Sequence, residues 1–228
     1  MSNLRSTPIV SLSLAAIALA ALAPGAACAE EKVPLKVELP PPLFVGTPVP
    51  VQLPQLEKPT PGKRPDLMVP VGTKLLSRKR PVTSSDEAPI MGEARQVTDG
   101  NKSGADGECV EFGPGLQWVQ IDLGAPARVA AIAVWHFHSE ARVYHDVIVQ
   151  VSDDPAFKRG VHTVFNNDDD NSARMGKGSD PAYIETNEGR LIDAQGAKGR
   201  YVRLYSNGNT SNDLNEYCEV EVFGTPEK

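Results

Sequence analysis

Hydrophobic and polar residues alternate along many short stretches of this chain. The clearest stretch is residues 118–124, with the sequence WVQIDLG, in which apolar and polar residues alternate after the tryptophan. A period of two is typical of a β-strand that turns one face toward a core. Gly124 and Pro126 follow, and neither residue favours a regular ladder, so we expect this strand to end at a turn.

Further short segments have the composition or the alternation of strands. They are residues 74–77, 110–112, 129–137, 143–152, 161–165, 183–185, 189–192, 200–206 and 218–223. Clusters of Gly, Pro, Asn and Asp separate them, and no long segment has helical periodicity, although residues 154–157 could form one helical turn. This pattern predicts an all-β domain, either a sandwich or a barrel.

The N-terminal residues have the features of an export signal. One positive charge precedes a mostly Ala, Leu, Ile and Val segment, residues 9–23, and the sequence Ala-Cys-Ala at residues 27–29 forms an A-x-A cleavage site. The apolar segment is too short to favour a membrane span. We expect residues 1–29 to be removed and the mature chain to be exported to the periplasm, the cell surface or the medium. Lipid attachment at Cys28 is the alternative, which Gly25 disfavours because a lipobox usually has Leu at that place.

Residues 30–65 are rich in proline. Proline cannot donate a backbone hydrogen bond and favours extended polyproline II structure, so we expect a semi-rigid spacer before a single domain at residues 66–228. A docking ligand for a proline-binding partner is the alternative. The formal net charge is −6 and residues 1–65 are slightly positive, so the domain itself is acidic. Acidic composition argues against nucleic acid and anionic lipid as partners.

Cys109 and Cys218 are the cysteines outside the expected signal peptide. An even number of cysteines in an exported chain permits a disulfide. We expect a bridge that ties the region before residue 118 to the last predicted strand. Two unpaired thiols are the alternative, because a sequence does not show whether two Cα atoms lie within bridging range.

Five motifs occur in order along the predicted domain. They are VTDGN at residues 97–101, WVQIDLG at 118–124, VQVSDD at 149–154, RYVRL at 200–204 and EVEVFG at 219–224. Together they resemble the discoidin domain, also called the coagulation factor type C (F5/8 type C) domain, of the galactose-binding-like superfamily. The resemblance covers about residues 70–225. It implies an eight-stranded jelly-roll β-sandwich whose loops at one end bind glycans, phospholipids or other proteins.

The resemblance also implies a structural calcium site, which many bacterial members contain. In the family, a loop that matches residues 99–103 and a glutamate of the last strand form this site, and Ca²⁺ prefers six to eight oxygen ligands. The ligands expected in this chain are Asp99, Asn101, Ser103 and Glu219. Glu221 is the second choice for the glutamate. An Asx-type turn beside a solvated strand edge is the alternative.

The strand at residues 129–137 is expected to end at the ligand loops. Galactose-binding members often have a Pro-Arg pair there, whereas this chain has an aromatic residue and a histidine, with an arginine nearby, which argues against simple galactose specificity. A sugar site needs planar polar groups and an aromatic face. The residues expected to contact a glycan are Phe137, His138, Arg142, Asn207, Asn209 and Asn212. Ordinary turn chemistry is the alternative for each asparagine.

Two other metal sites are weaker. His136 and His138 face one way on a strand, but zinc would need a third ligand from elsewhere, and ordinary histidines are the favoured interpretation. Residues 166–171 begin like an EF-hand loop, but Lys177 stands where the closing glutamate should be, so we expect a solvated acidic loop.

No motif for a catalytic nucleophile, a phosphate loop or a dinucleotide site is present. Counting carboxylates does not exclude a glycosidase pair, but the domain is too small to add a catalytic fold to a discoidin one. We therefore expect a non-catalytic exported module that binds an extracellular or cell-wall glycan through a calcium-stabilised jelly roll. The alternative is a cell-envelope protein-interaction or adhesion module without sugar specificity.

Overall fold

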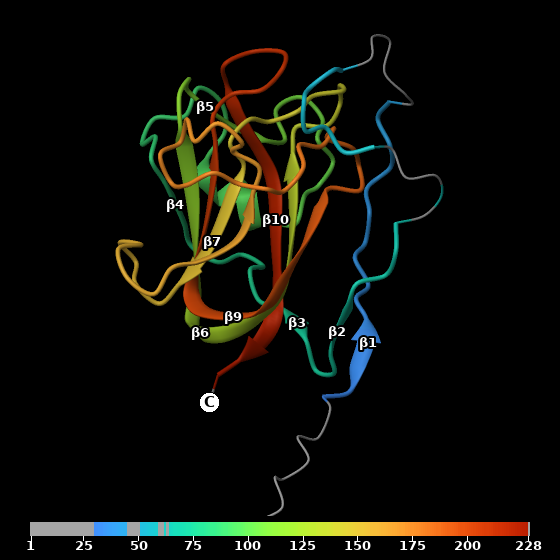
Figure 1. Ribbon diagram of the computed structural model, residues 1–228, viewed down its shortest axis with the longest axis vertical. Coiled ribbons are helices and arrows are strands. Elements are labelled where there is room, and N and C mark those ends of the chain that lie inside the picture. Colours follow the sequence, from blue (N-terminus) through green and yellow to red (C-terminus); the bar gives the residue numbers. More distant parts are fainter. Residues whose placement is uncertain (1–29, 45–50, 59–61, 63, 228) are drawn as a thin grey trace, which may run out of the picture. The chain divides into compact units, whose positions relative to one another are not determined.

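The computed structural model describes residues 30–44, 51–58, 62 and 64–227 (Figure 1). The expected signal peptide, with Cys28 and its cleavage site, lies outside the described residues. The compact unit considered below is Glu31–Lys228. Within the described ranges, no helix has the length and apolar character needed to cross a bilayer.

The described chain folds almost entirely from β-strands. The strands are β1 (Lys32–Pro34), β2 (Met68–Pro70), β3 (Lys74–Leu75), β4 (Val82–Ser84), β5 (Val110–Phe112), β6 (Gln117–His136), β7 (Ile148–Ser152), β8 (His162–Asn166), β9 (Arg190–Ser206) and β10 (Asn215–Pro226). A short 3₁₀ helix, η1, spans Ala94–Thr98. The main sheet is antiparallel in the order β3-β10-β6-β9-β7-β8, with β4 also paired to β6 and β5 to β10. This arrangement confirms the all-β prediction.

Two long strands carry the sheet through both layers of a sandwich. The first half of β6 pairs with the second half of β9, and after a register shift between Asp122 and Ala127 the remaining halves pair again. Both strands curve at the same end of the molecule (Figure 1). The prediction that a strand ends at Gly124 is therefore wrong. Gly124 has φ 85° and donates its N–H to Asp122 Oδ1 at 2.8 Å, which makes a bulge through which β6 continues.

The core lies between the two layers and follows the alternation of the sequence. Val119, Ile121 and Leu123 are buried in it, together with Val202 and Leu204 from β9. Because each strand contributes every second residue to this core, the period of two in the sequence predicts which side chains are inside.

Two other strand predictions need correction, and one observed strand is missing from the prediction. Residues 183–185 form no strand, since Tyr183 and Glu185 are buried through side-chain contacts while the chain runs as a loop. Strand β7 begins at Ile148 rather than at residue 143, because Asp146 has φ 51° and interrupts the extended backbone. Strand β4, which pairs with the first half of β6, is too short to show a clear alternation.

The proline-rich segment packs against the sheet instead of standing apart from it. Strand β1 pairs with β2, and the side chains of Leu35 and Val37 contact an apolar cluster on the outer face of β6 and β10. Farther along, Leu56 forms a bridge with Ala182. We call the described residues 31–44 and 51–58 the strap. The strap differs from the expected free spacer, and the compact unit begins near residue 31 rather than at residue 66.

The structure joins Cys109 and Cys218 in a disulfide, with an S–S distance of 1.97 Å and Cα atoms 4.0 Å apart. Both residues are buried in the apolar cluster beneath the strap. The bond connects the loop before β5 to β10, which are 109 residues apart in the sequence.

Candidate functional site

Three loops gather at the end of the sandwich opposite the bends of β6 and β9. These are residues 137–147, 167–189 and 207–214, the last of which is the red loop at the top of Figure 1. Backbone hydrogen bonds hold them together: the Glu185 N–H donates to the Arg142 carbonyl at 2.8 Å, and the Asn207 N–H donates to the His145 carbonyl at 2.9 Å. We call this region the loop end.

A histidine and a glutamate form a buried pair at the centre of the loop end. The Nδ1 atom of His136 lies 2.6 Å from Oε1 of Glu185, and neither side chain has any exposed surface. The His136 ring stacks on Tyr144 with centroids 4.3 Å apart, and it lies against Tyr217 at 4.6 Å. The final residue of β6 is therefore enclosed by side chains from two loops and from β10.

Arg142 lies between two carboxylates at the edge of this cluster. Its Nη1 donates to Glu216 Oε1 at 2.5 Å, its Nη2 donates to Glu140 Oε2 at 3.1 Å, and its guanidinium lies 4.4 Å from the centre of the Phe137 ring. Burial raises the pKa of Glu216, although Arg142 opposes this change. Burial alone would lower the pKa of Arg142, but Glu216 and Glu140 raise it overall. The guanidinium is thus a charged, planar group held against an aromatic face.

Several buried polar atoms of the loop end have no hydrogen-bond partner among the described residues. They are His136 Nε2, Arg142 Nε, Tyr144 Oη, Tyr183 Oη and Glu185 Oε2. Burial raises the pKa of both tyrosine hydroxyls, so these groups remain protonated donors. Each buried polar atom without a partner costs about 1–3 kcal/mol. These atoms have almost no exposed surface, so they lie behind the groups that a ligand from solvent could reach.

The asparagines expected to contact a glycan are bonded within their own loop or to the neighbouring 137–147 loop. Asn209 Nδ2 donates to Asn212 Oδ1 at 2.7 Å and to the Leu214 carbonyl at 3.0 Å, while its Oδ1 accepts N–H groups from the same turn. Asn207 Nδ2 donates to Asp146 Oδ2 at 2.8 Å. The structure places these side chains near the loop end but uses them to shape the loop, as turn chemistry would.

His138 connects two loops. Its Nε2 donates to the Lys102 carbonyl at 2.9 Å. Gly104 packs directly on the ring: it has φ 63°, and a Cβ atom there would lie 2.6 Å from Nε2 of His138. His138, Phe137 and Arg142 are all buried, whereas the side chain of Glu140 is 65% exposed.

The expected calcium loop faces the buried Glu219. The Oε2 atom of Glu219 accepts the Gly100 N–H at 2.8 Å, whereas its Oε1 has no partner within the described chain. Burial raises the pKa of Glu219 to about 8. An unpartnered buried carboxylate oxygen beside a loop of oxygen-bearing residues fits a bound Ca²⁺.

The loop also contains features that do not need a metal. Asp99 Oδ1 accepts the Asn101 N–H at 2.7 Å, and Asn101 Oδ1 accepts the Ser103 N–H at 3.0 Å. Arg78 packs on Gly100 and donates to the Asp99 carbonyl at 3.0 Å, so it supplies a positive charge to the same region. These bonds are those of an Asx turn, the alternative stated for this loop.

A second carboxylate group lies at the loop end, and the sequence alone did not suggest it. Oxygens of Asp146, Asp168 and Asp170 all lie within 4.8 Å of one another. Asp168 is fully buried, unlike the solvated residue expected in this loop, because backbone N–H groups of Ser172 and Ala173 donate to it at 3.0 Å each. Desolvation, together with the nearby Asp146, raises the pKa of Asp168. Asp146 is far from Asp168 and Asp170 in the sequence, so no spacing pattern links them.

Comparisons with known proteins identify the fold. No family model matches the sequence, and no curated protein matches it. Among solved structures, a truncated AlyQ with CBM32 and alginate lyase domains aligns with a TM-score of 0.50 at 21% identity, over 68% of this chain and 34% of that chain. The lectin binding domain of Lectinolysin complexed with Lewis b aligns with a TM-score of 0.48 at 18% identity, over 68% of this chain and 99% of that domain.

A Family 89 glycoside hydrolase from Clostridium perfringens also aligns, with a TM-score of 0.48 at 17% identity, over 67% of this chain and 15% of that chain. This chain therefore spans about a third or less of the two enzymes it matches. The chain has a jelly-roll β-sandwich fold like that in the AlyQ structure. Such low identities establish the fold and leave the function to be argued from the site.

Proposed function

We propose that this chain is a non-catalytic carbohydrate-binding module of the discoidin type, with its glycan site at the loop end. The observation that carries the proposal is a planar charged group held against an aromatic ring beside an exposed carboxylate. The Arg142 guanidinium lies 4.4 Å from the centre of the Phe137 ring and pairs with Glu140, whose side chain is 65% exposed. Sugar hydroxyls both donate and accept hydrogen bonds, so a glycan can satisfy groups of both kinds.

The shared fold supports the same conclusion. The AlyQ structure joins a CBM32 domain to an alginate lyase domain, and the lectin binding domain of Lectinolysin was solved with Lewis b. In the mature protein, an exported module of this kind would hold an extracellular or cell-wall glycan. Export rests on the features of residues 1–29 and stays a proposal, as does the absence of nucleic-acid and lipid partners.

We also propose that calcium stabilises the loop at residues 99–103. The residues that would hold the ion are Glu219, through its unpartnered Oε1, together with Asp99, Asn101 and Ser103. A bound cation would neutralise the buried carboxylate, which otherwise stays protonated because burial raises its pKa to about 8. Calcium would thus act on the stability of the loop rather than on a reaction.

A glycan array with residues 30–228 tests the function, first with calcium and then with a chelator. We expect defined sugar hits that weaken in the variant Arg142→Lys, which keeps the charge but loses the planar donors. The matched control is His162→Ala, because His162 is exposed on β8, at the opposite end of the sandwich. Hits that disappear in chelator would support the calcium proposal.

Two results would contradict the proposal. One is an empty array with a protein that is folded by circular dichroism; the protein-interaction alternative would then be tested by a pull-down from cell-envelope extract. The other is a set of hits that Arg142→Lys leaves unchanged and His162→Ala removes, which would move the glycan site away from the loop end.

A further inference from the structure

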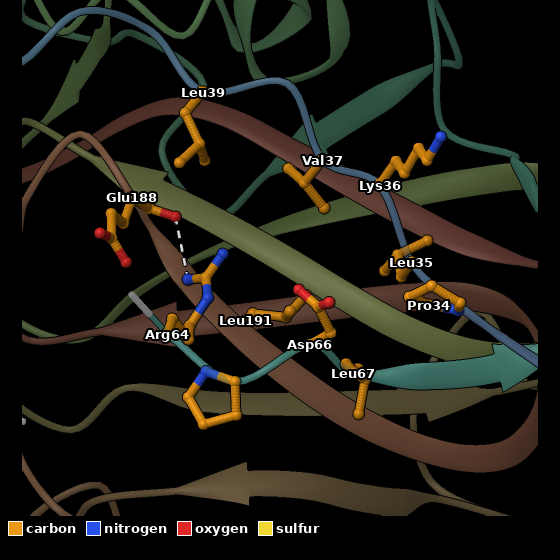
Figure 2. Close-up of a pocket in the computed structure, with 11 residues that line it drawn as sticks. Pro34, Leu35, Lys36, Val37, Leu39, Arg64, Asp66, Leu67, Glu188 and Leu191 are labelled. Atoms are coloured by element: carbon orange, nitrogen blue, oxygen red, sulfur yellow. Dashed lines mark hydrogen bonds between the residues drawn. The ribbon is translucent and has the colours of Figure 1, made fainter. Parts of the chain in front are cut away.

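A cleft lies between the strap and the body of the domain, beside the last residues of the 167–189 loop. Figure 2 shows it bounded by residues 34–39 of the strap, by residues 64–67 before β2, and by the start of β9. Its volume is about 290 Å³. The apolar residues that line it are Pro34, Leu35, Val37, Leu39, Pro65, Leu67 and Leu191, and the charged residues are Lys36, Arg64, Asp66 and Glu188. The cleft therefore combines aliphatic walls with charged groups, as many binding pockets do.

Arg64 extends into this cleft. Its Nη1 donates to the carbonyl oxygens of Glu188 at 3.1 Å and Gly189 at 2.9 Å (Figure 2). These bonds leave Nε and Nη2 without a hydrogen-bond partner among the described residues. Two neutral carbonyls orient the guanidinium but do not neutralise its charge.

The charge of Arg64 also lacks a carboxylate within ion-pair distance in the described part of the chain. The neighbouring Arg190, by contrast, has an ion pair with Glu57 at 2.6 Å. Burial lowers the pKa of Arg64, Glu188 opposes this change through its negative charge, and Arg190 adds to it. A half-buried cation beside a second cation is stabilised by an anion that can reach it.

We propose that this cleft binds a carboxylate that carries an aliphatic body, and that its occupant is the apolar C-terminal residue of a partner polypeptide. The carboxylate would accept hydrogen bonds from the free donors of Arg64, since guanidinium and carboxylate match as planar groups. The aliphatic side chain would contact Leu67 and Leu191. The volume suits about one residue, which is the size of ligand that a C-terminal recognition site holds.

A sugar acid is the less suitable occupant. Its carboxylate could pair with Arg64 in the same way, but several of its hydroxyl groups would lie against the leucine side chains, since Lys36, Asp66 and Glu188 are the other charged residues of the lining. Buried hydroxyls without partners are costly. The cleft shares no residue with the loop-end cluster, so this inference stands or falls separately from the proposed glycan site.

The test is an NMR titration of ¹⁵N-labelled residues 30–228 with N-acetyl-alanyl-leucine, which has a free carboxylate, and with its C-terminal amide. We expect saturable shifts at the backbone amides of Leu35, Leu67 and Glu188, and at least about tenfold weaker binding of the amide, because a charge-assisted bond is lost. In the variant Arg64→Gln, the acid should bind no more tightly than the amide. The control is Arg95→Gln, which alters an exposed arginine that pairs with Glu93.

Three outcomes would overturn the inference. They are the absence of shifts with the acid at millimolar concentration, equal binding of acid and amide, and unchanged binding by a folded Arg64→Gln protein. D-glucuronate serves as the competing ligand, and if it binds as tightly as the peptide, the occupant does not need an aliphatic body. The acid and amide are compared on the unmodified protein, so the result holds even where a variant folds poorly.

Discussion

The bond between Cys109 and Cys218 makes the stability of this protein strongly dependent on redox conditions. Both residues are buried beneath the strap, and they lie in different elements, the loop before β5 and β10. Reducing the bond leaves every side chain in place and removes the cross-link alone. The change in free energy of unfolding therefore reports the cross-link itself, apart from the small effect of adding two thiol hydrogens.

The magnitude follows from the size of the closed loop. A cross-link limits the conformations of the unfolded chain, and the entropy removed grows with the logarithm of the loop length. For the separation of 109 residues in this chain, this estimate gives about 4.8 kcal/mol at 25 °C, near the upper end of the ~2–5 kcal/mol measured when native disulfides are removed. For a domain of this size, ~1 kcal/mol corresponds to ~2–4 °C, so the melting temperature should fall by roughly 10–20 °C.

The assay is thermal unfolding followed by circular dichroism, on residues 30–228, oxidised and fully reduced. The reduced sample should be unfolded, reduced and refolded in reductant, because both sulfurs are buried. A thiol titration then verifies two free thiols. The double variant Cys109→Ala and Cys218→Ala serves as a control that reductant does not affect, and it should melt at or below the temperature of the reduced protein.

A single result would refute the reasoning. If the reduced protein shows two titratable thiols yet melts within about 2 °C of the oxidised protein, the cross-link contributes little. The unfolded ensemble would then already hold these segments close together, and the estimate from loop length would not apply to this chain.

Three more outcomes are expected. Burial raises the pKa of Glu219 from its ordinary value of 4.5 to about 8, so without calcium the protein should lose stability progressively as pH rises from about 4.5 through about 8. Urea unfolding at pH 5.5 and 9 should show this loss in wild type and not in Glu219→Gln, which should also lose any stabilisation by calcium. Replacing Lys102 with Met leaves the buried Glu221 without its ion-pair partner at 2.9 Å, and the free energy of unfolding should fall by about 3–5 kcal/mol. A second change, Glu221→Gln, should restore part of this loss. Residues 66–228 alone should melt several degrees below residues 30–228, because Leu35 and Val37 no longer cover the sheet; a free spacer would leave the melting temperature unchanged.

The sequence by itself determined the all-β class and the inward face of the strands. Val119, Ile121 and Leu123 are buried as their alternation predicts, because the period of two is a property of the extended backbone and needs no knowledge of distant residues. The loop positions were also predictable, since Gly, Pro, Asn and Asp act on their own backbone. The ordered motifs added the jelly-roll topology by resemblance.

The tertiary structure decided which polar side chains are free to bind a ligand. Arg142 pairs with Glu216, 74 residues away, and His136 pairs with Glu185, 49 residues away. From the sequence, Asn209 could either contact a ligand or shape a turn, and its side-chain hydrogen bond within the loop shows that it shapes the turn. The proline-rich segment has the composition of a spacer, yet the apolar face of the sheet makes its packing favourable. In each case the outcome depends on a partner brought close only by folding, and no local pattern records that partner.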